Sequence, residues 1–146
     1  MAVAVGPAGC ATRAPDTSSR SSTTATTDDS VIARDAARTA GELLAAYRAT
    51  TRRHPDLRRT LEPLAAHHAE HLAVLATDDL QPVRRRPRVP RARSAALASL
   101  QRRERAAAGS RQTALVAASS GDLARVLAAV VACQAQHLVL LDEGSE

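Results

Sequence analysis

Residues 56–75 read DLRRTLEPLAAHHAEHLAVL and residues 122–141 read DLARVLAAVVACQAQHLVLL, so nine of the twenty aligned positions are identical. Both segments carry a stripe of residues with steps of 4, 3, 4, 3 and 4, the spacing of one face of an α-helix. The stripe positions are Leu57, Leu61, Leu64, His68, His71 and Leu75 in the first copy and Leu123, Leu127, Val130, Gln134, His137 and Leu141 in the second. The repeat predicts two copies of a helical hairpin.

Each copy places two polar side chains on its inner stripe: His68 and His71 in the first, Gln134 and His137 in the second. The other stripe positions are aliphatic, so these side chains are expected to face the core. A buried polar group without a partner costs roughly 1 to 3 kcal/mol, against about 5 to 15 kcal/mol for the stability of a domain. The four side chains must therefore find partners.

The composition favours helix throughout the chain. The 146 residues include one Tyr, no Phe and no Trp, so the core must be built from Leu, Val and Ala. Sequences rich in Ala and Leu, with few β-branched runs and almost no aromatic residues, favour helix over sheet. A chain of this length has room for one domain with a buried core. We therefore predict an all-α fold.

Capping residues and prolines predict where the helices begin and end. They give four helices, over residues 28–53, 56–75, 94–117 and 122–141. Asp56 and Asp122 are the expected N-caps of the second and fourth helices. The first two helices and the last two are joined tightly, whereas residues 76–93 form a long crossover rich in Pro and Arg. Two hairpins joined by one long crossover make an antiparallel four-helix bundle over residues 30–143, with ferritin-like connectivity.

The positions of a ferritin-like metal centre are also present. Di-iron carboxylate bundles take a Glu-x-x-His motif from each of two helices and one Glu from each of the other two. The matching positions here read His68-Ala-Glu-His71 and Gln134-Ala-Gln-His137, with Glu104 on the third helix. On these residues the chain resembles the ferritin-like superfamily, and in particular the small actinobacterial ferritin-like proteins that often carry a lipoprotein leader.

The same positions depart from those of iron enzymes. His68 and Gln134 stand where the superfamily has bridging Glu residues, and a di-iron oxidase needs about four carboxylates, so we expect no di-iron oxidase chemistry. One interpretation is a mononuclear site for a divalent metal, zinc or iron, formed by three imidazoles and a carboxylate. Its ligands are His68, His71, Glu104 and His137. The other interpretation is a metal-free buried hydrogen-bond network that includes Gln134 and fixes the packing of the hairpins.

Three neighbouring residues fall outside the expected site. His67 and Glu70 lie off the inner stripe and are expected to face solvent. Cys133 lies within the fourth helix and is expected to serve as a small buried hydrophobe. None of the three is predicted to take part in the buried site, and the alternative for His67, which stands four residues before His71, is a surface metal clip formed by these two residues.

Residues 1–29 are expected to form a disordered leader or tether, because the segment is rich in Ser and Thr and has no apolar period. Ala8-Gly9-Cys10 is similar to the end of a bacterial lipobox, in which the Cys is acylated and anchors the protein to membrane lipid. The stretch before Cys10 is shorter than a complete signal peptide. The lipoprotein interpretation therefore needs a true start upstream of Met1, and the alternative is a cytoplasmic tail.

The chain carries a net charge of +5, and all 20 of its basic residues are Arg. The densest run lies in the crossover, at Arg84, Arg85, Arg86 and Arg88. Near a bilayer such a run would bind anionic headgroups, at about 1 kcal/mol per basic residue. The run has no stacking aromatic residues and no nucleic-acid-binding motif, so no nucleic-acid partner is expected.

These observations lead to three functional hypotheses. The first is a non-catalytic, envelope-associated ferritin-like module that is anchored through Cys10 and binds an unidentified partner. The second is a metal-binding protein with a mononuclear His/Glu site inside the bundle. The third is a cytoplasmic module that binds acidic partners through its Arg-rich loop.

Overall fold

The computed structural model describes residues 18–76 and 86–144, with side chains from residue 28 onward. Over these ranges the chain forms helices and their connections, and contains no strand. The elements are α1 (Ser18–Arg53), a 3-10 turn η1 (Pro55–Leu57), α2 (Arg58–Leu75), α3 (Arg93–Ala117) and α4 (Gly121–Glu143). The prediction of an all-α protein with four helices is confirmed for the described part of the chain.

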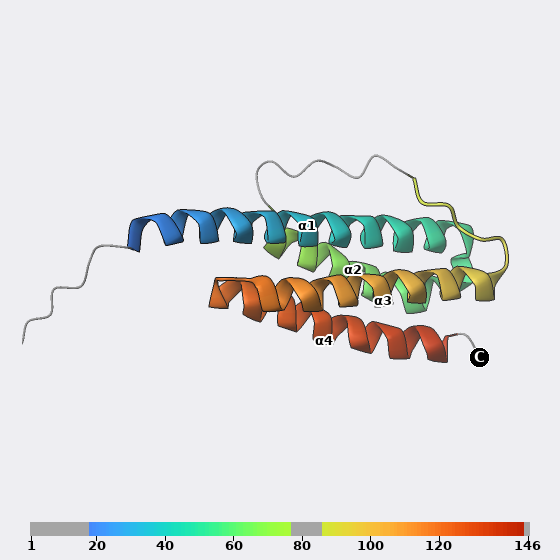
Figure 1. The fold of residues 1–146 in the computed structure, drawn as a ribbon. Helices are drawn as coiled ribbons and strands as arrows, with labels where there is room; N and C mark the ends of the chain where they lie inside the picture. The colour runs from blue at the N-terminus through green and yellow to red at the C-terminus, as the bar shows by residue number, and fades with distance from the viewer. Residues whose placement is uncertain (1–17, 77–85, 145–146) are drawn as a thin grey trace, which may run out of the picture.

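The four helices form two packed pairs (Figure 1). α1 packs mainly against α2, and α3 packs mainly against α4, while α1 also contacts α3 and α2 contacts α4. Each copy of the sequence repeat supplies the second helix of a pair. The connection within each pair is short, whereas the segment from α2 to α3 is long.

The observed helix starts differ from the predicted ones in α1, α2 and α4. α1 begins at Ser18, earlier than the start expected at residues 28–30, because no Gly or Pro lies between Ser18 and Gly41 and an established helix extends at little cost. The N-cap of α4 is Ser120 rather than Asp122, since the Ser120 hydroxyl accepts a hydrogen bond from the Leu123 amide at 3.4 Å.

The second helix also begins differently from the prediction. Asp56 does not cap it: this residue lies inside η1, where Pro55 occupies the first position. A proline suits that position because it lacks the amide hydrogen that would otherwise have no acceptor there. Of the leader predicted over residues 1–29, residues 18–29 are the first part of α1, whereas residues 1–17, with Cys10, lie outside the described residues.

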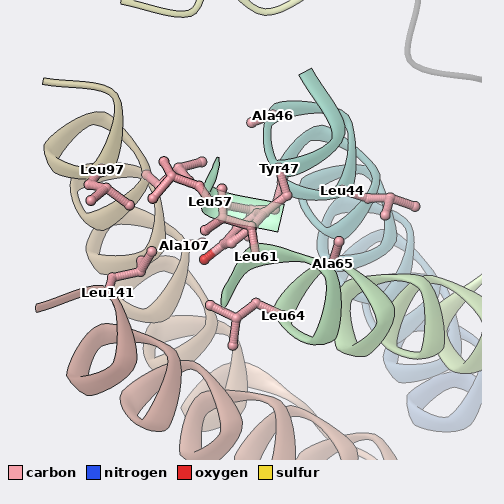
Figure 2. Close-up of a cluster of buried hydrophobic side chains, with 12 residues drawn as sticks. Leu44, Ala46, Tyr47, Leu57, Leu61, Leu64, Ala65, Leu97, Ala107 and Leu141 are labelled. Atoms are coloured by element: carbon pink, nitrogen blue, oxygen red, sulfur yellow. The ribbon is translucent and has the colours of Figure 1, made fainter. Parts of the chain in front are cut away.

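The core is aliphatic and lies between the helices, as the stripes predict. Its larger cluster is drawn in Figure 2 and includes Tyr47. All predicted stripe positions of α2 and α4 are buried except His71 and Leu123, which are partly buried. On α1, Ala40 is fully buried and Glu42 is exposed, so α1 contributes no carboxylate from Glu42 to the interior.

Candidate functional site

A single carboxylate, Glu104 on α3, lies at the centre of the bundle and is fully buried. Its Oε1 accepts hydrogen bonds from the Tyr47 hydroxyl at 2.7 Å, from His68 Nε2 at 2.7 Å and from His137 Nδ1 at 3.0 Å. Its Oε2 accepts from Gln134 Nε2 at 2.8 Å. The donors come from α1, α2 and α4, so this one side chain is bonded to each of the other three helices.

The network continues from Gln134 to a buried arginine. Arg111 Nη1 donates to Gln134 Oε1 at 2.9 Å, and Arg111 Nη2 donates to the Ala36 carbonyl oxygen at 3.3 Å. Arg111 is 2% exposed. Its positive charge stands close enough to Glu104 to interact with it and offsets part of the cost of burying the carboxylate.

These contacts keep Glu104 ionised. Burial alone raises the pKa of Glu104, but the hydrogen bonds from His137, His68 and Tyr47 favour the charged form more strongly, so its pKa lies well below the usual range. Burial and the neighbouring Glu104 charge raise the pKa of Tyr47, so the Tyr47 hydroxyl keeps its proton. The ionised carboxylate can only accept, which means that the facing nitrogens of His68 and His137 carry hydrogen.

Three buried nitrogens near this cluster have no hydrogen-bond partner among the described residues: His68 Nδ1, His71 Nδ1 and Arg111 Nε. Burial lowers the pKa of both His68 and His71, that of His71 to about 4. The neighbouring His68 and Arg111 also disfavour a charge on His71. His71 therefore stays neutral near pH 7.

The far edge of His137 meets a second set of side chains. His137 Nε2 lies 3.0 Å from His67 Nδ1 and 3.3 Å from Cys133 Sγ. The His67 and His137 rings are nearly parallel, with centroids 5.3 Å apart. Burial and the nearby Glu104 and Glu70 charges raise the pKa of the Cys133 thiol, which favours its protonated form.

The structure brings together most of the residues predicted for the site. His68, Glu104 and His137 have ligand atoms within 4.8 Å of one another, and Gln134 is hydrogen-bonded to Glu104. His71 lies outside this group, because its ring meets the His68 ring edge-on at 5.7 Å and not the carboxylate. Of the Arg run, Arg86 and Arg88 are exposed, and Arg84 and Arg85 lie outside the described residues.

Four side chains around Glu104 and His137 were not predicted as site residues: Tyr47, Arg111, His67 and Cys133. Tyr47 and Arg111 are buried on the inner faces of α1 and α3, and a Tyr or an Arg at helical spacing from apolar residues was the available signal. His67 and Cys133 gave no such signal, since both lie off the stripe. The prediction that His67 faces solvent is wrong: its ring is partly buried against His137.

Comparison with known proteins gives no further assignment. No family model, curated protein or solved structure matches this chain. The ferritin-like resemblance therefore stays a prediction from the sequence.

Two overlapping groups of side chains could hold a metal ion. They are His68 with Glu104 and His137, all buried, and His67 with Cys133 and His137, of which the first two are partly exposed. The groups share His137 but use opposite nitrogens of its ring. Neither resembles a di-iron centre, because Glu104 is the one buried carboxylate among the described residues and the two irons need several.

Proposed function

We propose that the protein is a non-catalytic helical module of the ferritin-like type, in which Glu104 holds the two helix pairs together. The observation that carries this proposal is that one carboxylate on α3 accepts hydrogen bonds from α1, α2 and α4. Displacing any one helix breaks a buried charge-assisted hydrogen bond, which is among the stronger polar contacts in proteins. The cluster thus fixes how the helices pack.

The ferritin-like topology of two antiparallel hairpins is part of the same proposal. It is supported by the short connections at residues 54–57 and 118–120 and by the long one between α2 and α3. Short loops favour antiparallel neighbours, and a long crossover between two hairpins is typical of ferritin-like bundles. The duplicated stripe adds independent support from the sequence.

The donor set explains why the module is proposed to lack oxidative iron chemistry. His68 and Gln134 occupy the positions of the bridging carboxylates, and both hydrogen-bond to Glu104. Two oxidised irons would add about six positive charges beside the Arg111 guanidinium, with a single carboxylate to balance them. The site is built to neutralise one buried carboxylate.

Aerobic oxidation of Fe(II) tests this proposal. We expect the protein to leave the rate of Fe(II) oxidation equal to that of a buffer blank. An acceleration that requires the protein and is lost in Glu104→Gln would overturn it. Exposed Glu62 on α2 supplies the control substitution, Glu62→Gln, because it lies outside the cluster.

A second candidate function is the binding of one divalent metal at His68, Glu104 and His137. The observation that favours it is that the three ligand atoms lie within 4.8 Å of one another and are fully buried. An ion there would have to displace the hydrogens by which both imidazoles bind the carboxylate, so metal uptake would compete with the existing network.

Metal analysis of untagged protein tests the second candidate. Binding inside the bundle predicts about one equivalent of metal in the wild type and its loss in His68→Gln and in the His71→Ala, His137→Ala double variant. Less than about a tenth of an equivalent in the wild type would rule the candidate out. Retention of metal in His68→Gln would also count against it.

Association with the cell envelope remains the proposed location. Its supports are the lipobox-like Cys10 and the exposed Arg86 and Arg88 of the crossover, which suit anionic headgroups. α4 is also long and apolar enough to cross a membrane by length and composition, a property that core helices of soluble proteins share.

Membrane fractionation of cells that express the gene with its upstream codons tests the lipid anchor. Release of the Cys10→Ala variant into the soluble fraction is the expected result, and an unchanged distribution would contradict it.

A further inference from the structure

The edge of His137 that faces away from Glu104 is the feature that the proposed function leaves unused. His137 Nδ1 donates its hydrogen to Glu104 Oε1, so in the neutral ring Nε2 carries a lone pair. That lone pair points toward the other two side chains, His67 Nδ1 at 3.0 Å and Cys133 Sγ at 3.3 Å. Both of these groups compete for one acceptor in the metal-free protein.

We propose that His67, Cys133 and His137 form a binding site for one late divalent metal ion of the zinc class, and that Glu104 is the positioning residue for His137. A carboxylate that holds the far ring nitrogen of a ligating histidine is the usual companion of protein metal sites, because it fixes the tautomer and raises the basicity of the ligand. Here that carboxylate is buried, and it is held by three further donors.

The donor distances are close to those that zinc requires. Bond lengths of about 2.05 Å to nitrogen and about 2.3 Å to sulfur place tetrahedral ligand atoms about 3.4 Å apart for two nitrogens and about 3.6 Å apart for nitrogen and sulfur. The observed separations from His137 Nε2 are 3.0 and 3.3 Å. An ion therefore needs the ligands to move apart by a few tenths of an ångström. The partly exposed His67 ring must also turn, and its hydrogen must move from Nδ1 to Nε2 so that the Nδ1 lone pair faces the ion. The Cys133 thiol must release its proton to solvent, because the thiolate is the ligand.

The chemistry of the donors selects the class of metal. One thiolate and two imidazoles suit late divalent ions such as zinc, whereas the hard ions magnesium and calcium prefer oxygen ligands. The fourth tetrahedral position has no protein ligand in the group. Because His67 and Cys133 are partly exposed, water or an external ligand can fill that position.

The position of the site in the repeat gives independent support. His67 and Cys133 are aligned residues of the two copies, as are His71 and His137. His67 on α2 and Cys133 on α4 thus occupy the same position of the repeat, and their ligand atoms, one borderline and one soft, lie within 4.8 Å of each other. A site of this kind joins the two helix pairs at a place that the Glu104 network does not cover.

This site shares His137 and Glu104 with the network of the proposed function, but its other two ligands lie outside that network, so the two can be tested separately. The inner cluster, formed by His68, Glu104 and His137, uses His68. The outer site, formed by His67, Cys133 and His137, uses His67 and Cys133 instead. His68→Gln therefore removes an inner ligand alone, and Cys133→Ser removes an outer ligand alone. His71→Gln is a matched control, since His71 lies on the same helix and belongs to neither group.

Titration of the untagged full chain with Co²⁺ is the direct test, carried out in a Cys10→Ala background so that Cys133 is the one thiol left. We expect one equivalent to bind with a thiolate-to-cobalt charge-transfer band, and zinc to displace it. Cys133→Ser should abolish the band, His67→Gln should weaken binding by at least about 10-fold, and the His71→Gln control should retain both.

The role of Glu104 is tested in the same titration. Glu104→Gln should lower the cobalt affinity by about 10- to 100-fold while keeping the charge-transfer band, because a positioning residue leaves the ligand set intact. Thermal unfolding of this variant shows whether it is folded. If it is not, protection of the Cys133 thiol from alkylation by zinc in the otherwise unaltered chain gives the deciding measurement.

Several outcomes would overturn the proposal. They are the absence of cobalt binding, binding without a thiolate band, and binding that survives Cys133→Ser but is lost in His68→Gln. The last result would place the ion in the inner cluster. Equal alkylation of Cys133 with and without zinc would likewise refute the proposal.

Discussion

Glu104 shows how a charged side chain can lie inside an aliphatic bundle. An isolated carboxylate is too costly to bury and would be expected to take up a proton. Glu104 instead meets four hydrogen-bond donors on three helices. The paired state is favourable because the donors replace the water that the carboxylate loses on burial. The loss of any partner leaves the buried charge without part of this compensation. The stability of the whole bundle is therefore sensitive to this residue.

Replacement of Glu104 should destabilise the protein more than any surface substitution. Glu104→Ala leaves four buried donors without an acceptor, and we expect the free energy of unfolding to fall by at least about 3 kcal/mol, as measured by urea denaturation. Glu104→Gln keeps the shape of the side chain, so its free energy of unfolding should lie between those of Glu104→Ala and the wild type. Glu62→Ala removes an exposed contact with Arg58 at 3.4 Å, so it should change stability by at most about 0.5 kcal/mol. Similar losses in Glu104→Ala and Glu62→Ala would contradict the importance of the cluster.

Tyr47 should contribute through its hydroxyl as well as its ring. Tyr47→Phe removes the 2.7 Å hydrogen bond to Glu104 and should lower the free energy of unfolding by about 1.5 to 3 kcal/mol, the usual range for a bond to a charged group. Combined with Glu104→Gln, the two losses should not add, because the hydroxyl has already lost its charged partner. Strict additivity in the double-mutant cycle would show that the hydroxyl acts elsewhere.

His71 should make stability depend on pH below neutrality. Burial lowers its folded-state pKa from 6.5 to about 4. Between these values the unfolded chain takes up a proton that the folded chain excludes, so the free energy of unfolding should fall as the pH drops from about 6.5 to about 4. Thermal unfolding between pH 7 and pH 5 measures this slope. His71→Leu should flatten the slope without removing it, because burial lowers the pKa of His68 in the same direction; an unchanged slope would rule out His71 as a source.

At the scale of the helices, the ends are held by contacts that are distant in sequence. Asp29 on α1 accepts hydrogen bonds from the amides of Ser119 and Ser120, at 2.8 and 2.7 Å. Ser120 in turn caps α4. One carboxylate near the predicted start of the first helix thus fixes the turn between α3 and α4.

Replacement of Asp29 should therefore destabilise the protein more than replacement of the neighbouring Asp28. Asp29→Ala leaves two backbone amides without their acceptor, and we expect a loss of about 1 to 2 kcal/mol in urea denaturation. Asp28 is the matched control, since it is exposed, and Asp28→Ala should stay within about 0.5 kcal/mol of the wild type. Equal effects of the two substitutions would argue against a specific role for the Asp29 contacts.

Across the whole molecule, the two polar clusters connect helices of different pairs. The Glu104 network reaches all four helices, and the proposed metal site bridges α2 and α4. Ligands that bind only the folded state stabilise it by mass action. Metal binding and global stability should consequently be linked in this protein.

Zinc should raise the resistance of the protein to unfolding. At a free zinc concentration of about 100 times the dissociation constant, the free energy of unfolding should increase by about 2.7 kcal/mol. Thermal unfolding with zinc, compared with unfolding in the presence of a chelator, measures this change. Cys133→Ser should show no zinc-dependent shift, whereas His71→Gln should keep it. An identical shift in Cys133→Ser would mean that zinc acts at another place.

Much of the fold and part of the site could be predicted from the sequence. The alternation of three- and four-residue steps identified the buried faces of α2 and α4, and it placed His68, Gln134 and His137 in the interior, where they are found. His71 satisfied the same rule and yet is only partly buried. Capping was predicted less well, because Ser120 and Asp122 are both good N-caps and the local backbone selects between them.

The sequence by itself determined which residues form helices and which face of each helix is apolar, because these properties depend on local propensity and on a period of 3.6 residues. Only the tertiary structure decided which atoms meet. The axial offset and rotation of neighbouring helices arise from side-chain packing across the whole interface, and no local pattern encodes them. For that reason Glu104 could be placed on an inner face but not matched to Tyr47, and His67 and Cys133 gave no signal of their contact with His137.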